Sequence, residues 1–446
     1  MGRYFGTDGI RGEFGGPILN ARMVRRIGRA LARWASEVAG EGAPRFALGR
    51  DTRESGCLIR DWLVEGFAAE GVAAVYDLGI LPTPVTAFSG DLLGVGLAIS
   101  ITASHNPEGD NGIKLFASGC RKLRPETELE IEAIIEELEG DLEGGTEAVI
   151  SPSELGRRAY LERFKDRFKG RVPEGMKVVV DLANGAASET AGSALRGLGI
   201  EVVVIGEAGE GSLINDGVGS EHPELLARRV FGEGADCGFA FDGDGDRLVM
   251  VDGNGLVVDG DQLLGAVALR LRERGELDGD TLVTTIQSNS GLDTAMGEAG
   301  ITVLRTDVGD RNVQELVLGE EYSLGGENSG HLIFRNFLAT GDGLGAAGSI
   351  LSLFDAGELR EMNKTVGAAV TLFPQASAAV LVGDKRPLEE RLRLAAARAA
   401  VEREIGGRGR VLVRYSGTEP KLRLLVEAES GEKAEACLAR LVEAVD

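Results

Sequence analysis

The hexapeptide DGDGDR at residues 242–247 is the stretch whose residue types point most directly to chemistry. Three aspartates alternate with glycines between two apolar runs: Asp242, Asp244 and Asp246. Three hard oxygen donors this close together suit Mg²⁺. An EF-hand is excluded, because Arg247 and Gly253 stand where that loop has glycine and glutamate. A polar hairpin turn is the alternative, but a turn needs only one or two aspartates, so we predict one Mg²⁺ site per chain.

A second candidate loop, TASHNP at residues 102–107, follows an apolar run. If that run is a parallel strand, Ser104 lies at its carboxyl end, the edge at which open parallel sheets bind ligands. His105 adjoins the serine and Lys114 follows ten residues later, so one interpretation is a hydroxyl nucleophile with acid–base groups nearby. The other is an Asn-Pro turn with a capping serine. A serine–histidine hydrolase pair is not predicted, because adjacent side chains on an extended chain point apart and no G-x-S-x-G motif is present.

The glycine-bounded segment GENSGH at residues 326–331 carries three polar groups on alternate residues: Glu327, Ser329 and His331. On an extended chain all three face one side and could bind the vicinal hydroxyls or an amine of a sugar. A hydrogen-bonded loop without a ligand explains the pattern equally well.

The last polar loop, RYSGTEPKLR at residues 414–423, gathers phosphate-type donors around a glycine: Arg414, Ser416, Thr418, Lys421 and Arg423. Hydroxyls, backbone amides and a guanidinium fork together can bind phosphate. A turn between two strands with incidental charges is the alternative. The density of donors in an acidic chain favours the phosphate site.

The elements that must position these loops alternate between strand and helix patterns. Short apolar runs such as 94–101 and 176–182 predict buried parallel strands, and helical spacing such as that at 20–38 predicts the helices between them. The expected fold is α/β, with three successive αβ domains of mixed or parallel sheets and a smaller C-terminal α+β domain. We name the four loops the serine loop (102–107), the metal loop (242–247), the sugar loop (326–331) and the phosphate loop (414–423). We expect one in each of four domains, at residues 1–150, 151–252, 253–365 and 366–446 in that order.

Composition limits the partners of the chain. The 71 acidic and 48 basic residues give a net charge of −23, which disfavours nucleic acid and anionic membranes as partners. A phosphorylated substrate therefore needs local basic groups. The four cysteines form no CxxC pair, which is typical of reduced thiols in a cytoplasmic protein. No run of about 18 apolar residues predicts a membrane span, and the apolar positions serve a core or a homodimer interface equally well.

The whole chain resembles the α-D-phosphohexomutase family through seven motifs in the expected order: FGTDGIRG at 5–12, TASHNPEGDNGIKLF at 102–116, INDGVGS at 214–220, DGDGDR at 242–247, VGDRNV at 308–313, GENSGH at 326–331 and RYSGTEPKLR at 414–423. The resemblance implies a phosphoserine enzyme whose four domains surround a central cleft. Within the family, GE-x-SGH and SGTEP favour the members that act on glucosamine phosphates, although Thr102 stands where many of those members have serine.

The resemblance also implies a role for each matching residue. Ser104 is the residue that carries the phosphoryl group, and its phosphate completes the metal site of the three aspartates. His105 is a catalytic candidate because it adjoins Ser104. Two positions match acid–base groups and two match residues beside the transferring phosphoryl group: Lys114 with His331, and Arg11 with Arg247. The other matches contact the sugar hydroxyls or the distal phosphate: Glu327 and Ser329 for the sugar, and Arg414, Ser416, Gly417, Thr418 and Arg423 for the phosphate.

The expected reaction interconverts glucosamine 6-phosphate and glucosamine 1-phosphate. The sugar hydroxyl attacks the phosphoserine while a base removes its proton, and the resulting glucosamine 1,6-bisphosphate also serves as the activator. The main alternative is the same chemistry on mannose or glucose phosphates. A metal-dependent sugar phosphatase has no need of two phosphate sites. A non-catalytic sugar-phosphate binder has no need of a nucleophile.

Overall fold

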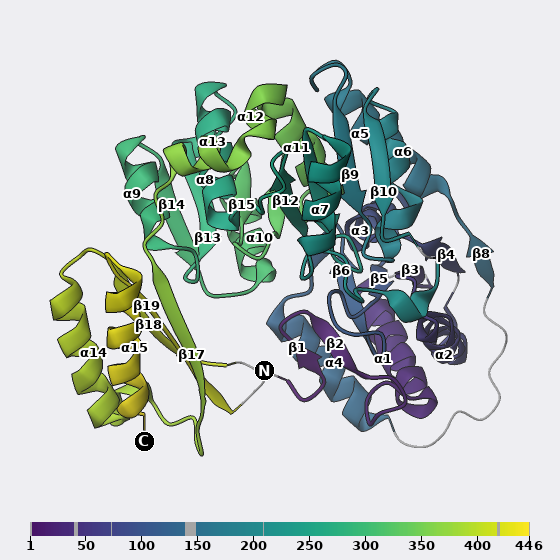
Figure 1. Cartoon of the computed structure of the whole chain (residues 1–446). Coiled ribbons are helices and arrows are strands. Elements are labelled where there is room, and N and C mark those ends of the chain that lie inside the picture. The colour runs from purple at the N-terminus through teal and green to yellow at the C-terminus, as the bar shows by residue number, and fades with distance from the viewer. Residues whose placement is uncertain are drawn as a thin grey trace.

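The chain forms four sheets with flanking helices, arranged in an arc (Figure 1). The first and last sheets lie at the two ends of the arc, with the N-terminus between them. The predicted fold class, α/β with a smaller α+β unit at the C-terminus, is confirmed. The computed structural model describes residues 2–39, 43–72, 74–138, 149–207, 209–416 and 420–445.

The first sheet has eight strands and mixes parallel with antiparallel pairing. In sheet order the strands are β1 (Phe5–Gly6), β2 (Gly9–Glu13), β6 (Asp110–Ala117), β5 (Leu97–Ile101), β3 (Arg45–Arg50), β4 (Ala74–Ile80) and β8 (Ile150–Pro152), with β7 (Arg121–Lys122) beside β6. The helices of this unit are α1 (Ala21–Ala39), α2 (Ser55–Ala69), α3 (Thr83–Leu93) and α4 (Pro125–Glu137). Because β5 runs parallel to β3 and antiparallel to β6, the serine loop turns the chain at the carboxyl end of β5.

The second and third sheets share one topology, three parallel strands followed by an antiparallel edge strand. The second consists of β10 (Glu201–Ile205), β9 (Lys177–Asp181), β11 (Cys237–Phe241) and β12 (Leu248–Asp252). The third consists of β14 (Thr302–Thr306), β13 (Thr281–Thr285), β15 (Leu324–Gly326) and β16 (Leu332–Phe334). The turn before each edge strand is the metal loop in one unit and the sugar loop in the other, so the two loops occupy equivalent positions.

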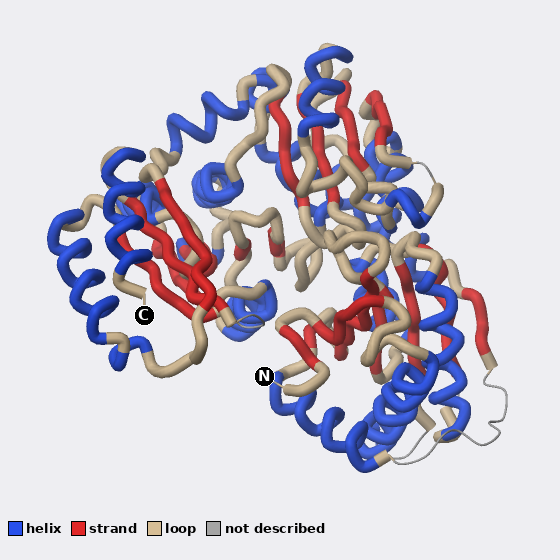
Figure 2. The backbone as a smooth tube through the Cα atoms, turned by 60° about the horizontal axis from the view of Figure 1, so that its bottom comes forward, coloured by secondary structure: helices blue, strands red, loops and turns tan. Residues whose placement is uncertain are grey.

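Helices of both units surround these sheets, as the tube view shows (Figure 2). Those of the second unit are α5 (Leu155–Phe168), α6 (Ala191–Arg196) and α7 (Glu224–Glu233). Those of the third are α8 (Gly260–Glu273), α9 (Ser290–Glu298), α10 (Asp310–Gly319), α11 (Gly343–Leu353), α12 (Ala356–Arg360) and α13 (Met362–Ala369). None of the helices in the described part of the chain combines the length and apolar character of a bilayer-spanning segment.

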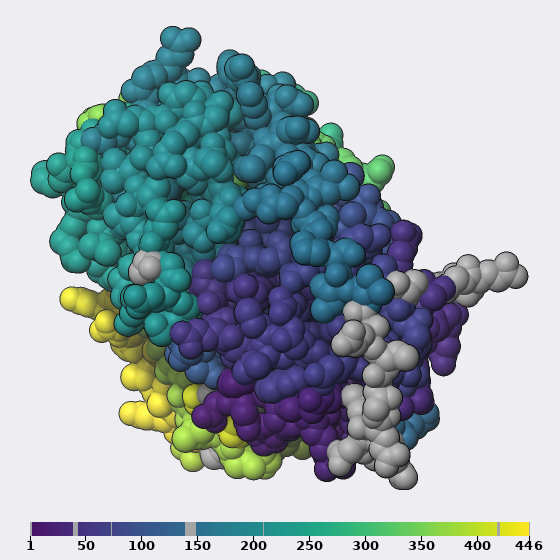
Figure 3. Space-filling model, turned by 90° about the vertical axis from the view of Figure 1, so that its right-hand side faces the viewer, coloured from purple at the N-terminus to yellow at the C-terminus, as the bar shows by residue number. Residues whose placement is uncertain are grey.

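The last sheet is antiparallel, in the order β17 (Gln375–Leu381), β19 (Lys421–Glu427) and β18 (Arg410–Tyr415), with α14 (Leu392–Ile405) and α15 (Gly431–Glu443) packed on it. It has an apolar core of its own. One continuous core instead joins α3 to the second and third units, and Figure 3 shows the second unit lying directly against the first. The first three units are therefore tightly joined, whereas the last is attached at one end.

Candidate active site

The metal loop brings its three aspartates together. Carboxylate oxygens of Asp242, Asp244 and Asp246 lie within 4.8 Å of one another, and all three residues are buried. Within the described residues, the Oδ1 atom of Asp244 has no hydrogen-bond partner. Buried carboxylate oxygens need a donor or a cation, so this set fits a hard divalent ion such as Mg²⁺. Burial, together with the charges of Asp246 and Asp244, raises the pKa of Asp242 to about 8.

Ser104 lies against the metal loop. Its hydroxyl donates to Asp242 Oδ2 at 2.6 Å, and the residue is almost fully buried. Its backbone φ of 55° is in the left-handed region. The two loops approach closely because Gly243 has no side chain, since a Cβ there would lie 2.5 Å from the Ser104 carbonyl oxygen. The Ser104 hydroxyl of the first domain thus reaches Asp242, a predicted metal ligand of the second domain.

His105 does not lie where its sequence position predicts. Its Nδ1 is 3.3 Å from Ser104 Oγ, so the expectation that the two side chains point apart is wrong. The reason is the left-handed φ of Ser104, which turns the chain where an extended segment was assumed. Burial and then the charges of Arg247 and Arg11 lower the pKa of His105 to about 4, which leaves the imidazole neutral at pH 7.

Beside the metal loop, six side chains of alternating charge form a closed ring: Lys114, Asp8, Lys122, Asp310, His331 and Asp246. Lys114 Nζ lies 2.8 Å from Asp246 Oδ2 and 3.0 Å from Asp8 Oδ2. Asp8 Oδ1 contacts Lys122 Nζ at 2.5 Å, and Lys122 in turn pairs with Asp310. His331 Nε2 closes the ring, 3.7 Å from Asp310 Oδ2 and 3.0 Å from Asp246 Oδ1. The ring joins groups from the first three domains.

The ring decides the charge of the two predicted acid–base residues. Burial alone would lower the pKa of Lys114, but the carboxylates of Asp244, Asp246 and Asp8 raise it well above its ordinary value. Burial would also lower the pKa of His331, and Asp246 and Asp310 outweigh it, giving a pKa of about 8. Both groups therefore hold protons at neutral pH.

The sugar loop is a tight turn, so the extended geometry considered for it is wrong. Glu327 N donates to His331 O at 2.9 Å and Gly330 N to Glu327 O at 3.0 Å. Glu327 and His331 are consequently buried on one side, with Glu327 Oε2 3.6 Å from His331 Nδ1, whereas Ser329 is exposed. Gly330 has a φ of 93°, and a Cβ there would lie 2.3 Å from Leu248 O. Glycine therefore allows the close approach in which Leu248 N donates to Gly330 O at 3.0 Å. This bond pairs the sugar turn with the metal turn.

Arg11 and Arg247 flank the serine loop. Arg11 pairs with Asp8, and Arg247 donates its backbone N–H to Asp242 Oδ1 at 3.1 Å. Both guanidinium groups act on the pKa of His105. The buried Nε atoms of both arginines have no hydrogen-bond partner among the described residues. Positive groups with unused donors beside a serine hydroxyl are suited to phosphoryl oxygens.

The predicted phosphate loop lies in the last domain. Arg414 on β18 stands directly opposite Arg423 on β19, and like charges in that position repel each other. Burial and then Arg423 lower the pKa of Arg414, which marks a place that would accept an anion. Ser416 is buried, and its carbonyl accepts from Lys385 Nζ at 2.8 Å. Two predicted contacts lie outside the described residues: Gly417 and Thr418.

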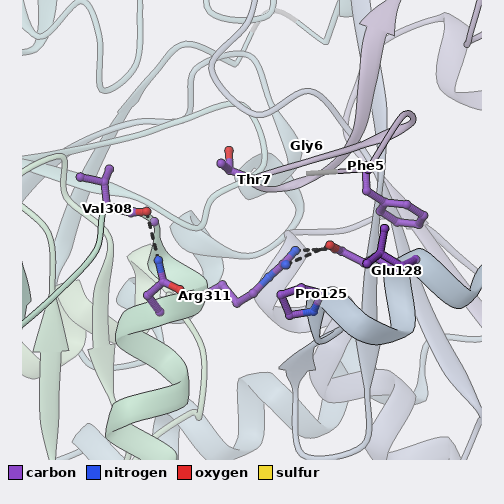
Figure 4. Close-up of a pocket in the computed structure, with 11 residues that line it drawn as sticks. Phe5, Gly6, Thr7, Pro125, Glu128, Val308 and Arg311 are labelled. Carbon is purple, nitrogen blue, oxygen red and sulfur yellow. Dashed lines mark hydrogen bonds and ion pairs between the residues drawn. The ribbon is translucent and has the colours of Figure 1, made fainter. Parts of the chain in front are cut away.

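A cavity of about 270 Å³ lies where the first domain meets the third (Figure 4). The ion pair of Arg311 with Glu128 spans it. Thr7 and Gly309, the chain neighbours of Asp8 and Asp310 in the ring, form part of its wall. None of the predicted site residues lines it, so it adjoins the site and is not the site itself.

Sequence reasoning missed several residues of this site. Asp8 and Asp310 lie within quoted motifs, FGTDGIRG and VGDRNV, and could have been found there. Lys122 lies outside every motif, and only the turn after β6 brings it to the ring. Thr83, whose hydroxyl donates to Asp244 Oδ2 at 2.6 Å, begins a helix that was not predicted.

Comparison with known proteins defines the class of the chain. Four family models match consecutive segments: phosphoglucomutase/phosphomannomutase α/β/α domain I over residues 2–141, domain II over 158–255, domain III over 259–374 and the C-terminal domain over 378–444. The chain belongs to the phosphoglucomutase/phosphomannomutase family and is an isomerase of the phosphohexomutase type. The domain boundaries drawn from the sequence stay a prediction.

Individual relatives match over the full length. The chain is 41% identical to the phosphoglucosamine mutase of Bordetella avium, with 99% of each chain covered. It is 40% identical to the phosphoglucosamine mutase of Lactococcus lactis subsp. lactis, covering 100% of this chain and 99% of the relative. Among solved structures, a phosphoglucomutase/phosphomannomutase family protein from Burkholderia thailandensis superposes with a TM-score of 0.80 at 26% identity, covering 98% of this chain and 95% of that one.

Proposed function

We propose that the chain interconverts glucosamine 6-phosphate and glucosamine 1-phosphate, with Ser104 as the residue that gives and receives the phosphoryl group. The observation that carries the proposal is the contact of 2.6 Å between Ser104 Oγ and Asp242, inside the loop that fits Mg²⁺. A buried serine hydroxyl on a metal ligand is the arrangement that a phosphoserine bound to the same ion requires.

Each group then has a task in phosphoryl transfer. Mg²⁺ held by the three aspartates would withdraw negative charge from the phosphate on Ser104. Arg11 and Arg247 hold the equatorial oxygens with their free donors. Lys114 Nζ and His331 Nε2 lie on either side of Asp246. His331, with a pKa of about 8, takes up and returns the proton of the attacking sugar hydroxyl, whereas Lys114 stays protonated and stabilises the negative charge that develops on the oxygens. Arg414, Ser416 and Arg423, with the predicted Gly417 and Thr418, bind the phosphate at the other end of the sugar.

The substrate is argued from the relatives and from one carboxylate. Full-length relatives at 40–41% identity are phosphoglucosamine mutases. Glu327 is buried beside His331, and its negative charge favours a sugar that carries an ammonium group. The glucosamine 1,6-bisphosphate formed midway is the proposed activator, since it restores the phosphate on Ser104.

The four cysteines, all without disulfides, support the cytoplasmic location predicted from the sequence.

A side-by-side assay tests the proposal. The 1- and 6-phosphates of glucosamine, glucose and mannose are compared with Mg²⁺ and a trace of bisphosphate, and the Ser104→Ala variant serves as the control. A preference for the glucosamine pair that is lost in the variant supports both substrate and nucleophile. A preference for glucose or mannose keeps the chemistry and overturns the substrate. Phosphate release without isomerisation would make the enzyme a sugar phosphatase.

A further inference from the structure

We infer that Arg53 and Asn215 are positioning residues that hold the Ser104 loop in its reactive conformation. Both donate hydrogen bonds to the same two carbonyl oxygens, those of Ser104 and Asn106. They come from different domains. The inference rests on the proposed function, because it assumes that Ser104 carries the phosphoryl group.

Arg53 fixes the loop from the first domain. Its side chain is fully buried, and a guanidinium has five N–H donors. The structure gives it five acceptors: Asp51 Oδ2 at 3.0 Å, Asp110 O at 3.0 Å, Ser104 O at 3.2 Å, Asn106 O at 2.7 Å and Pro107 O. Four of the five are carbonyls of residues 104–110. One side chain therefore saturates the inner face of the loop.

Asn215 fixes the same loop from the second domain. Its Nδ2 donates to Ser104 O at 2.9 Å and to Asn106 O at 3.1 Å. Its own backbone is held, with φ 58° and its N–H on Ala183 O at 2.9 Å. A Cβ on Gly243 would lie 2.9 Å from Asn215 Nδ2, so the amide lies beside the metal loop. Asn215 thus ties the serine loop to the domain that holds Asp242.

A clamp is needed because the loop conformation is unfavourable by itself. Ser104 has a φ of 55°, a left-handed value that a serine adopts only when surrounding contacts impose it. Thr102 adds to these contacts, since its Oγ1 accepts from Ser104 N at 2.8 Å and donates to Asp51 Oδ2 at 2.6 Å. If the donors to Ser104 O were lost, the φ of Ser104 would relax and its hydroxyl would move away from Asp242.

Asn215→Ala tests this role, and Asn363→Ala is its matched control. Asn363 on α13 also donates from one amide to two acceptors, Asp252 Oδ2 at 2.9 Å and Leu256 O at 3.1 Å, and neither belongs to the site. The readouts are phosphate occupancy of Ser104 by intact mass, the single-turnover rate of transfer from phosphorylated enzyme to the sugar phosphate, KM and thermal stability. Normalising the rate to phosphorylated enzyme removes any loss that comes from misfolding.

We expect Asn215→Ala to slow transfer per phosphorylated enzyme by about 10- to 100-fold, the effect of displacing a reacting group by roughly 1 Å. KM should stay within about threefold, because the phosphate loop of the last domain is unchanged. Arg53→Lys, which keeps the charge and loses the five-donor fork, should slow transfer in the same way. Asn363→Ala should transfer at the wild-type rate.

Two results would overturn the inference: a wild-type transfer rate in Asn215→Ala, or an equal loss of rate in Asn363→Ala. The proposed function fails in a different way. In that case the wild-type enzyme itself carries no transferable phosphate on Ser104, and the inference falls with it.

Discussion

The serine–metal centre and the phosphate loop of the last domain are built in opposite ways. At the centre, charges of both signs alternate around a ring and every carboxylate has a cation beside it or the metal site to serve. In the last domain, two arginines stand opposite each other on neighbouring strands. One continuous core joins part of the first domain to the second and third domains, whereas the last domain has only a core of its own.

This difference separates chemistry from substrate capture. Preorganised, buried charges stabilise a transition state without further rearrangement, so the centre can act on whatever hydroxyl is presented to Ser104. An anion that binds between two arginines relieves the repulsion between their guanidinium groups, so we expect the last domain to contribute mainly to substrate binding. Substitutions at the centre should lower kcat or stability, and those in the last domain should raise KM.

Ser104→Ala should give the largest effect. Removing the proposed phosphoryl acceptor should lower kcat by about 10³-fold or more, as loss of a nucleophile does elsewhere, with KM nearly unchanged. Steady-state mutase assays measure both constants. Ser416→Ala, a serine of the last domain, is the control and should affect KM more than kcat. A kcat of Ser104→Ala within tenfold of the wild-type value would contradict the assignment of chemistry to the centre and of binding to the last domain.

Lys114→Met should destabilise the fold. Lys114 Nζ lies 2.8 Å from both Asp244 and Asp246, and removing one partner of a buried ion pair typically costs about 3–5 kcal/mol. Denaturant unfolding measures the loss, and added Mg²⁺ should recover part of it by neutralising the same aspartates. Lys364→Met, at an exposed lysine, should change the free energy of unfolding by less than about 0.5 kcal/mol. Equal stability of the two variants would contradict the ring.

Chelation of the metal should stop catalysis and spare the fold. Loss of a Lewis acid worth several kcal/mol predicts a fall in kcat of roughly 10²-fold or more. Lys114 still neutralises the aspartates, so circular dichroism should show a folded protein in EDTA. Adding back Mg²⁺ should restore activity. Unfolding on chelation would mean that the metal, and not the lysine, holds the loop together.

Arg414→Ala should give the smallest effect and the opposite kinetic signature. Loss of a charged hydrogen bond to phosphate, about 1.5–3 kcal/mol, predicts a KM raised by roughly 10- to 100-fold with a smaller change in kcat. Stability should stay level or rise by about 0.2–1 kcal/mol, the range of charged cross-strand pairs. Arg408→Ala, at an exposed arginine of the same domain, is the control. A change confined to kcat would mean that Arg414 acts in phosphoryl transfer and not in substrate binding.

The sequence predicts the repeated elements of this fold well, because buried strands are short apolar runs and helices keep a 3.6-residue period. The apolar runs 94–101 and 176–182 contain β5 and β9, and the helical spacing at 20–38 matches α1 to within one residue at each end. The helix α3 and the β2–β6 pairing were not predicted. The residues of α3 and β6 are buried on several faces, so neither segment shows a clean hydrophobic period.

The site residues that lie in motifs could be predicted from the sequence. The contacts that bring them together in space could not. The metal and sugar turns meet because Leu248 N bonds to Gly330 O, a contact between two domains. The position of His105 depends on the φ of Ser104, and that of Lys122 on the turn after β6. Backbone conformation and domain packing determine these contacts, and neither can be read from the spacing of residues in the sequence.

The most direct test is to locate the transferred phosphate. Enzyme with Mg²⁺ is incubated with glucosamine 1,6-bisphosphate labelled in its phosphates, then digested, and the labelled peptide is identified by mass spectrometry. The account predicts one label per chain on Ser104 and its complete transfer to added glucosamine phosphate. A label on Ser416 or Ser329, or a label on Ser104 that sugar phosphate does not remove, would contradict it.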